Sequence, residues 1–134
     1  MKRKITLFAI AFLFPLIGFS QSSCEKFKNG TFKFTDPKTK KVCVITRDGK
    51  IQTEKMQDAE EVYDFDIVWL DDCTYTVTPT AATMARNKDA SKIGTMTVKI
   101  VQAKDSSYVQ KISIANNRRF KRTDEVFVMN EAGN

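Results

Sequence analysis

The sequence predicts an all-β protein, an antiparallel meander of seven to eight short strands. Apolar and polar residues alternate in successive short runs from residue 30 onward, which is the period of a strand with one buried face. Turn-forming pairs such as Asp36-Pro37 and Asp48-Gly49 separate these runs. Because neighbouring runs are joined by short turns, we expect antiparallel pairing in sequence order, in a sheet curled so that its edges are protected.

The first twenty residues have the pattern of an export signal. Three basic residues at 2–4 precede the apolar run 5–19, and Gly18 and Ser20 are the small residues that a signal peptidase requires at positions −3 and −1. The apolar run is shorter than the roughly 20 residues of a membrane-spanning helix. We therefore predict a signal peptide at 1–20, followed by one domain.

That domain is expected to be a single all-β unit over 21–134, located in the periplasm or outside the cell. The chain has 22 Lys and Arg, of which three lie in the leader, against 16 Asp and Glu, so the domain's net charge is near +3. This excess is too small and too dispersed to predict a nucleic-acid partner.

The first strands are expected at 30–35 and 42–56. In "GTFKFT", Phe32 and Phe34 share one face of the strand. In "VCVITRDGKIQTEKM", Asp48-Gly49 can supply the two positive φ angles of a type I′ turn. The second segment is therefore predicted to be a two-stranded hairpin.

The run "EVYDFDIVWL" predicts the next strand. Its core face carries Tyr63, Phe65, Ile67 and Trp69. Asp64 and Asp66 alternate with them and point to water. In the following run, "DDCTYTVTPT", Tyr75 and Val77 face inward and Pro79 ends the strand.

Residues 81–91 break the alternation and predict at most one short helix. Alternation returns in "IGTMTVKIVQA", "SSYVQKISIA" and "RRFKRTDEVFVMN". The strand count and short turns favour a curled sheet or a small barrel of lipocalin-like character.

The three cysteines allow three disulfide pairings. Cys43 lies in mid-strand, where it packs like a small apolar residue, whereas Cys24 precedes the first strand and Cys73 begins another. We predict a Cys24–Cys73 disulfide and a reduced, buried Cys43. Lipid attachment at Cys24 is disfavoured, because the polar residues 21–23 stand where a lipobox needs small or aliphatic ones.

Parts of the chain resemble a group of small exported bacterial proteins of unknown function. The matching segments are "CEKFKNGTFKF", "ITRDGKIQTEK" and "IVWLDDCTYTV", with a looser match at "KIGTMTVKI". The resemblance implies an all-β fold with one early cysteine and another after a Trp-containing strand. Some of these proteins carry the label DNA topoisomerase IV, which does not suit a chain of 134 residues without an ATPase motif.

No catalytic or cofactor site is predicted. The chain has no histidine, which excludes Ser-His-Asp and Cys-His catalysis, and no glycine-rich phosphate loop. Without histidine or C-x-x-C spacing, no metal site is expected. Asp64, Asp66, Asp71 and Asp72 could form paired carboxylates, but their strand and turn positions favour solvent exposure.

The basic run "RRFKR", residues 118–122, has two interpretations. It could bind an anionic surface, with Phe120 stacking between cations. The simpler interpretation is a charged edge strand that resists unwanted pairing.

The most informative polar set lies in the hairpin, where Arg47, Gln52 and Glu54 share one face with apolar residues. If this face lines a barrel interior, these residues form a polar cluster in an apolar cavity, as small-molecule sites do. If it faces solvent, they are ordinary cross-strand partners. Tyr63 and Trp69, on the core face of the next strand, complete the candidate ligand-binding set.

We therefore expect an exported, non-enzymatic domain that binds a small apolar or amphipathic ligand in a barrel or curled sheet. The alternative is an envelope protein that docks on a partner protein through a sheet face or its basic edge strand.

Overall fold

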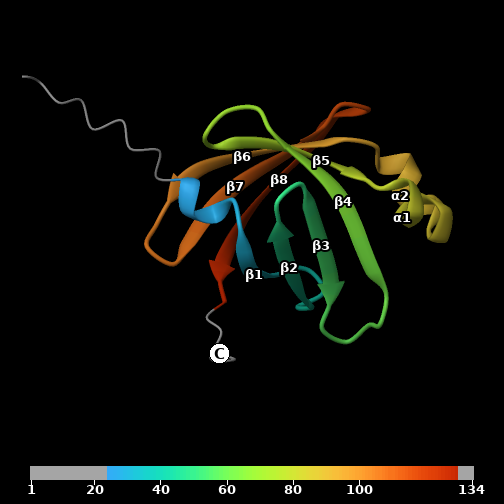
Figure 1. The fold of residues 1–134 in the computed structure, drawn as a ribbon, viewed down its shortest axis with the longest axis horizontal. Helices are drawn as coiled ribbons and strands as arrows, with labels where there is room; N and C mark the ends of the chain where they lie inside the picture. Colours follow the sequence, from blue (N-terminus) through green and yellow to red (C-terminus); the bar gives the residue numbers. More distant parts are fainter. Residues whose placement is uncertain (1–23, 130–134) are drawn as a thin grey trace, which may run out of the picture.

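The computed structural model describes residues 24–129 and shows a closed, eight-stranded antiparallel barrel (Figure 1). Each strand pairs with its sequence neighbours, and β8 returns to pair with β1. The predicted all-β meander is confirmed. In chain order the elements are η1 (Glu25–Phe27), β1 (Gly30–Thr35), β2 (Val42–Asp48), β3 (Ile51–Met56), β4 (Val62–Trp69), β5 (Thr74–Pro79), α1 (Ala81–Arg86), α2 (Lys88–Ile93), β6 (Met96–Ala103), β7 (Ser107–Ile114) and β8 (Asn117–Val128).

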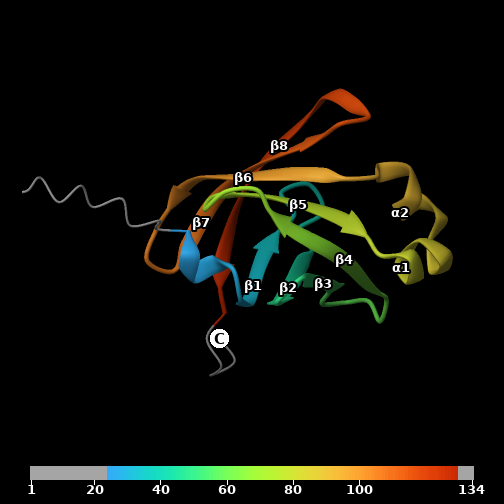
Figure 2. The same cartoon turned by 45° about the horizontal axis from the view of Figure 1, so that its top comes forward.

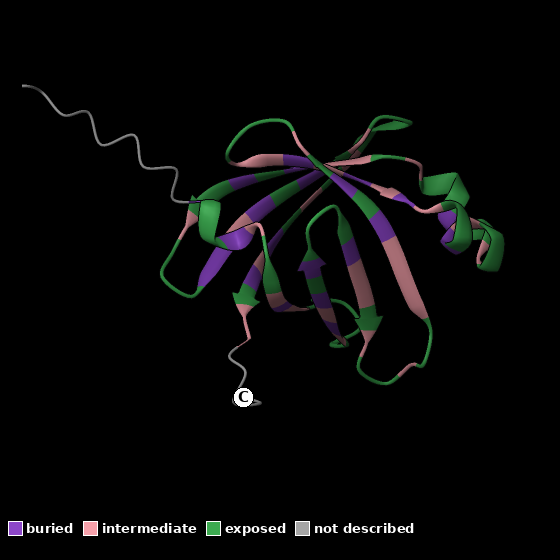
Figure 3. Ribbon diagram, viewed as in Figure 1, coloured by how far each residue is buried: buried purple, intermediate pink, exposed green. Residues whose placement is uncertain are grey.

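The alternation in the sequence appears as alternating burial along the strands (Figure 3). In β4, Phe65 and Ile67 are buried whereas Asp66 and Val68 are exposed. In β5, Tyr75 is only 1% exposed. The predicted core faces of these two strands are confirmed, and they place one polar-tipped aromatic side chain deep inside the barrel.

The β2–β3 hairpin forms as predicted, but its loop is displaced. Asp48 pairs with Ile51, so the two loop residues are Gly49 and Lys50. Gly49 has φ 62°, and Asp48 is not among the described residues with a positive φ. The observed pairing shifts the predicted register by two residues. Because side chains alternate with a period of two, the same residues still share a face.

The segment after β5 holds two short helices, where at most one was predicted. The Thr80 side chain accepts a hydrogen bond from the backbone nitrogen of Thr83 and begins α1. The Asn87 side chain accepts bonds from the nitrogens of Asp89 and Ala90 and begins α2. Since Asn87 is in an extended conformation, it interrupts what would otherwise be one helix.

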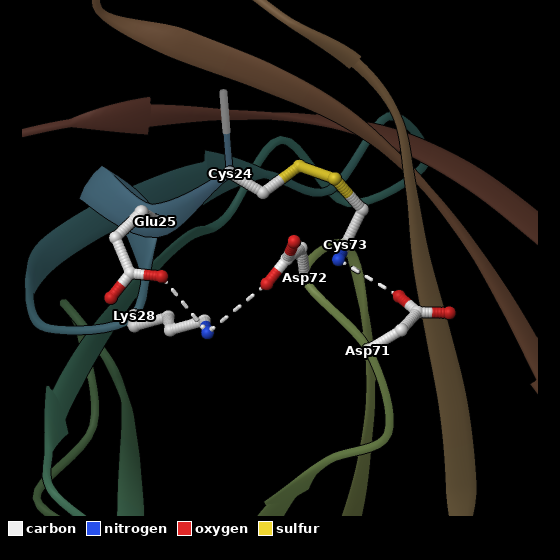
Figure 4. Close-up of a disulfide and its surroundings, with 6 residues drawn as sticks. All are labelled: Cys24, Glu25, Lys28, Asp71, Asp72 and Cys73. Carbon is white, nitrogen blue, oxygen red and sulfur yellow. Dashed lines mark hydrogen bonds and ion pairs between the residues drawn. A yellow bond between two sulfur atoms is a disulfide. The ribbon is translucent and has the colours of Figure 1, made fainter. Parts of the chain in front are cut away.

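The other end of the barrel is covered by η1, far from the two helices (Figures 1 and 2). The Phe27 side chain is fully buried, with its ring centroid 4.7 Å from that of Tyr108. The predicted Cys24–Cys73 disulfide is present and ties η1 to the β4–β5 turn, and Cys43 is free and buried as expected. Lys28 lies between the carboxylates of Glu25 and Asp72 beside this bridge (Figure 4). We call this the closed end.

The predicted signal peptide at 1–20 lies outside the described residues. Within 24–129, no helix combines the length and apolar character needed to cross a bilayer.

Candidate ligand-binding site

The barrel contains a cavity of about 560 Å³. It extends from the buried side chains of Tyr75 and Gln110 to the exposed Asp89 and Ile93 on α2. The cavity therefore lies toward the end of the barrel that carries α1 and α2, opposite η1 (Figure 1). We call this the helical end. Its apolar wall comprises Phe34, Cys43, Ile45, Met56, Phe65, Val77, Pro79, Ala90, Ile93, Met96, Val98, Ile112 and Phe120.

Arg47 lies behind the cavity, in the core of the closed end, and is only 2% exposed. One terminal nitrogen donates to the hydroxyl oxygens of Tyr75 at 2.7 Å and Tyr108 at 2.6 Å, and the other donates to the Phe27 carbonyl at 2.9 Å. The guanidinium also lies 4.7 Å from the centroid of the Phe32 ring. These contacts satisfy a buried cation by hydrogen bonds and aromatic faces, without a carboxylate at ion-pair distance among the described residues.

The surroundings fix the protonation states of Arg47 and Tyr75. Burial by itself would lower the pKa of Arg47, but the Tyr75 and Tyr108 oxygens and Glu54 outweigh it and raise that pKa, so the guanidinium stays charged. Burial raises the pKa of Tyr75 well above its ordinary value. The Tyr75 phenol therefore keeps its proton, which it donates to Gln110 Oε1 at 3.2 Å.

Gln52 links Arg47 to the cavity. Its Oε1 accepts from Arg47 Nε at 2.8 Å, and its Nε2 donates to Glu54 Oε1 at 2.9 Å. Because Arg47 has no acceptor atoms, it fixes the orientation of the Gln52 amide, which in turn holds one oxygen of Glu54. The Glu54 carboxyl group is thus positioned from the core.

Glu54 lines the cavity, and only one of its two carboxyl oxygens is hydrogen-bonded to the described protein. The side chain lines the cavity and is partly exposed there, and Oε2 has no hydrogen-bond partner in the part of the chain that the structure describes. Burial away from bulk water raises the pKa of Glu54. The Gln52 hydrogen bond and the positive charges of Arg47 and Arg122 act in the opposite direction but do not outweigh burial. A ligand group at this oxygen would therefore meet a positioned, poorly solvated carboxyl group.

Gln110, which the sequence analysis did not single out, supplies a second group of this kind. Its side chain is 4% exposed and lines the cavity. The Tyr75 hydroxyl donates to Gln110 Oε1, whereas Gln110 Nε2 makes no hydrogen bond within 24–129. The signal was present in "SYVQKISI", since Gln110 falls between Tyr108 and Ile112 on an otherwise apolar face.

The structure brings four of the five predicted site residues together. Gln52, Glu54 and Tyr63 line the cavity, and Arg47 supports Gln52 from behind. The Tyr63 hydroxyl accepts a bond from Asn87 at 2.8 Å, which joins β4 to the helical end. Trp69 does not line the cavity.

Trp69 instead packs at the closed end. Its ring centroid lies 4.6 Å from that of Tyr75, and the Lys28 ammonium lies 5.2 Å above its ring. Its indole nitrogen is buried without a hydrogen-bond partner among the described residues. Trp69 is therefore a packing residue of the closed end.

Two residues of the basic run also reach the cavity. Phe120 and Arg122 line it, whereas Arg118, Arg119 and Lys121 are exposed. Arg122 Nε donates to the largely buried Asp124 carboxylate at 2.8 Å. The cation in the cavity wall thus already has a carboxylate partner.

Cys43 lines the cavity as a neutral thiol. Burial, and to a lesser extent Glu54, raises its pKa to about 12. Since the thiolate is the nucleophilic form, this cysteine is not activated for covalent chemistry.

The aspartates considered for catalysis lie elsewhere. Asp66 is exposed, and Asp64 accepts a bond from Thr53 at 2.8 Å outside the cavity wall. Asp71 accepts from the Cys73 backbone in the β4–β5 turn, which lowers the Asp71 pKa. Within 24–129 no three His, Cys, Asp or Glu side chains are grouped to hold a metal ion.

Comparison with known proteins gives no match to a protein-family model, a curated protein or a solved structure.

Proposed function

We propose that this protein is an exported, non-enzymatic binding protein that holds a small apolar or amphipathic molecule inside its barrel. The observation that carries this proposal is the cavity of about 560 Å³ with an apolar wall and a polar inner end. Ligand sites in proteins commonly have about 300–1,000 Å³, with apolar lining and a few polar groups that orient the ligand. A barrel that served only as a scaffold would gain by filling this space, because voids weaken packing.

The proposal can be tested by filling the cavity. Met96 lines it from β6, and Met96→Trp places a larger side chain in the space a ligand would use. Binding of the neutral apolar dye N-phenyl-1-naphthylamine, followed by fluorescence, should weaken at least about tenfold, since about 1.4 kcal/mol of lost contact has this effect.

The matched control is Val101→Trp on the same strand. Val101 is 45% exposed and does not line the cavity, so this variant should bind the dye like the parent protein. Both variants should retain the far-ultraviolet circular dichroism of the parent. Equal dye binding by all three proteins would refute the cavity as the binding site. Native mass spectrometry of protein purified from its source should in addition show a co-purifying small molecule.

A second candidate function is docking on a cell-envelope protein through the β7–β8 hairpin. The hairpin projects from the barrel (Figure 2), and β8 pairs with β1 only at Phe127 and Val128, so the described contacts leave the outer edge of the 118–122 segment without a strand partner. The exposed Arg118, Arg119 and Lys121 give this edge a positive charge. An acidic partner strand or loop would suit it.

Reversal of these three charges separates the two candidates. The variant R118E/R119E/K121E should lose salt-sensitive crosslinks to envelope proteins if the edge is the docking surface, while dye binding in the cavity stays unchanged. Arg122 is left intact because it lines the cavity and pairs with Asp124. Crosslinks that survive the reversal would exclude the basic edge.

A further inference from the structure

We propose that the cavity selects amphipathic molecules whose head group is a protonated amine, which donates hydrogen bonds to Glu54 Oε2 while the apolar part fills the barrel. This inference rests on the proposed binding function and adds the chemical class of the ligand. It depends on three features of the site: an unpartnered carboxylate oxygen, the balance of charge in the wall, and the aromatic lining.

The first feature is the position of Glu54. Gln52 holds Oε1 at 2.9 Å, and Arg47 fixes Gln52 in turn. Glu54 lines the cavity, and its Oε2 has no hydrogen-bond partner in the described chain. A poorly solvated carboxylate with a free oxygen is costly in the empty protein, and a donor group that carries positive charge would offset this cost most effectively.

The second feature is the charge of the cavity wall. Three carboxylates line it, from Asp36, Glu54 and Asp89, against one cation, Arg122. Arg122 already pairs with Asp124 at 2.8 Å, whereas no ion pair involves Glu54 among the described residues. An anionic head group beside Glu54 would therefore meet like charge, and a cationic one would not.

The third feature is the aromatic lining. The rings that line the cavity are those of Phe34, Tyr63, Phe65, Tyr75 and Phe120. Aromatic faces attract ammonium groups and also pack well against aliphatic chains. One lining can thus accept both parts of an amphipathic amine. The free Gln110 amide nitrogen is a neutral donor and adds no charge that would oppose this ligand.

Titratable and charged groups surround Glu54 on four strands. They are Cys43 and Arg47 from β2, Tyr63 from β4, Tyr75 from β5 and Arg122 from β8. The arginines are charged and the Cys43 thiol is neutral at neutral pH, so Glu54 is the group of this set that changes charge in the acidic range.

The experiment compares decylamine, 1-decanol and decanoate, which share one apolar chain and differ in the head group. Each is titrated at pH 7 against the dye complex. Decylamine should bind about 10- to 100-fold more tightly than decanoate, the ratio expected for a charge-assisted hydrogen bond of about 1.5–3 kcal/mol. Decanol should lie between them.

Glu54→Gln keeps the acceptor for Gln52 but removes the charge. In this variant decylamine and decanol should bind within about threefold of each other, because the ion pair is lost while the apolar contacts remain. Glu60→Gln, an exposed change outside the cavity wall, should keep the parent's preference.

Stability gives a readout that needs no ligand. The folded-state pKa of Glu54 is raised, so the parent loses stability as pH rises from the ordinary carboxyl range through that pKa. Glu54→Gln should therefore unfold at a higher urea concentration than the parent at pH 7, with the gap closing below pH 4.5, the ordinary pKa of the group.

The outcomes separate the two proposals. If the dye does not bind, the binding function fails. If the dye binds but none of the three compounds displaces it, the amine inference is overturned. If decanoate binds best, if the three bind equally, or if Glu54→Gln keeps the amine preference, the binding function stands and the amine inference is overturned.

Discussion

Arg47→Met is expected to destabilise the protein by about 3–5 kcal/mol, the cost of removing one partner from a buried charged network. The substitution preserves much of the side-chain volume but leaves the Phe27 carbonyl, Gln52 Oε1 and two tyrosine hydroxyls without their donor. Urea unfolding followed by tryptophan fluorescence measures the loss, because Trp69 packs on Tyr75 beside this cluster.

Arg119→Met serves as the control for this prediction. Arg119 is exposed on β8, and its replacement should change the free energy of unfolding by less than about 0.5 kcal/mol. Arg47→Lys should fall between the two, since an ammonium keeps the charge but cannot reach all four acceptors. A loss below about 1 kcal/mol for Arg47→Met would show that the buried network contributes little to stability.

Loss of the Cys24–Cys73 disulfide should destabilise the fold by about 4 kcal/mol in the chain-entropy model, given the sequence separation of 49 residues. The expected comparison is between the double variant C24A/C73A and the parent in urea. The bridge holds η1 over the closed end of the barrel. Its loss should therefore loosen both the packing of Phe27 and the hydrogen bond from Arg47 to the Phe27 carbonyl.

Reduction of the parent protein separates the cross-link from the packing of the two cysteines. Dithiothreitol should destabilise the parent to nearly the level of the double variant and leave the variant unchanged. Cys43→Ala, which removes a free thiol, should keep its sensitivity to dithiothreitol. A parent protein whose urea midpoint is insensitive to dithiothreitol would contradict the predicted role of the bridge.

Much of this architecture could be predicted from the sequence, because alternation reports directly which face of a strand is buried. Phe65, Ile67, Tyr75 and Val77 face inward as the pattern indicates. The hairpin face that carries Arg47 was also predicted correctly, even though the loop lies one residue later than expected, because the resulting two-residue change of register keeps the faces.

What alternation cannot give is the function of a polar residue once it faces inward. Arg47 and Glu54 were predicted together, yet Arg47 is a core residue that donates four hydrogen bonds, whereas Glu54 borders the cavity. Arg47 is bonded by Phe27 and Tyr108, which are distant in the chain, so the pattern within the hairpin could not reveal its role. Trp69 was assigned to the site on its strand face alone, but position along the strand places it at the closed end.

The separation of the closed end from the helical end has a consequence for protein engineering. The disulfide and the Arg47 network, which should carry much of the stability, lie at one end, while Ala90 and Ile93 line the cavity from a short helix at the other. Ala90 is buried, but Ile93 is exposed, so substitutions at Ile93 can change the helical end of the cavity without touching the disulfide or the Arg47 network. If the cavity binds a small molecule as proposed, its selectivity could therefore be redesigned from α2 while the stabilising contacts at the closed end are left intact.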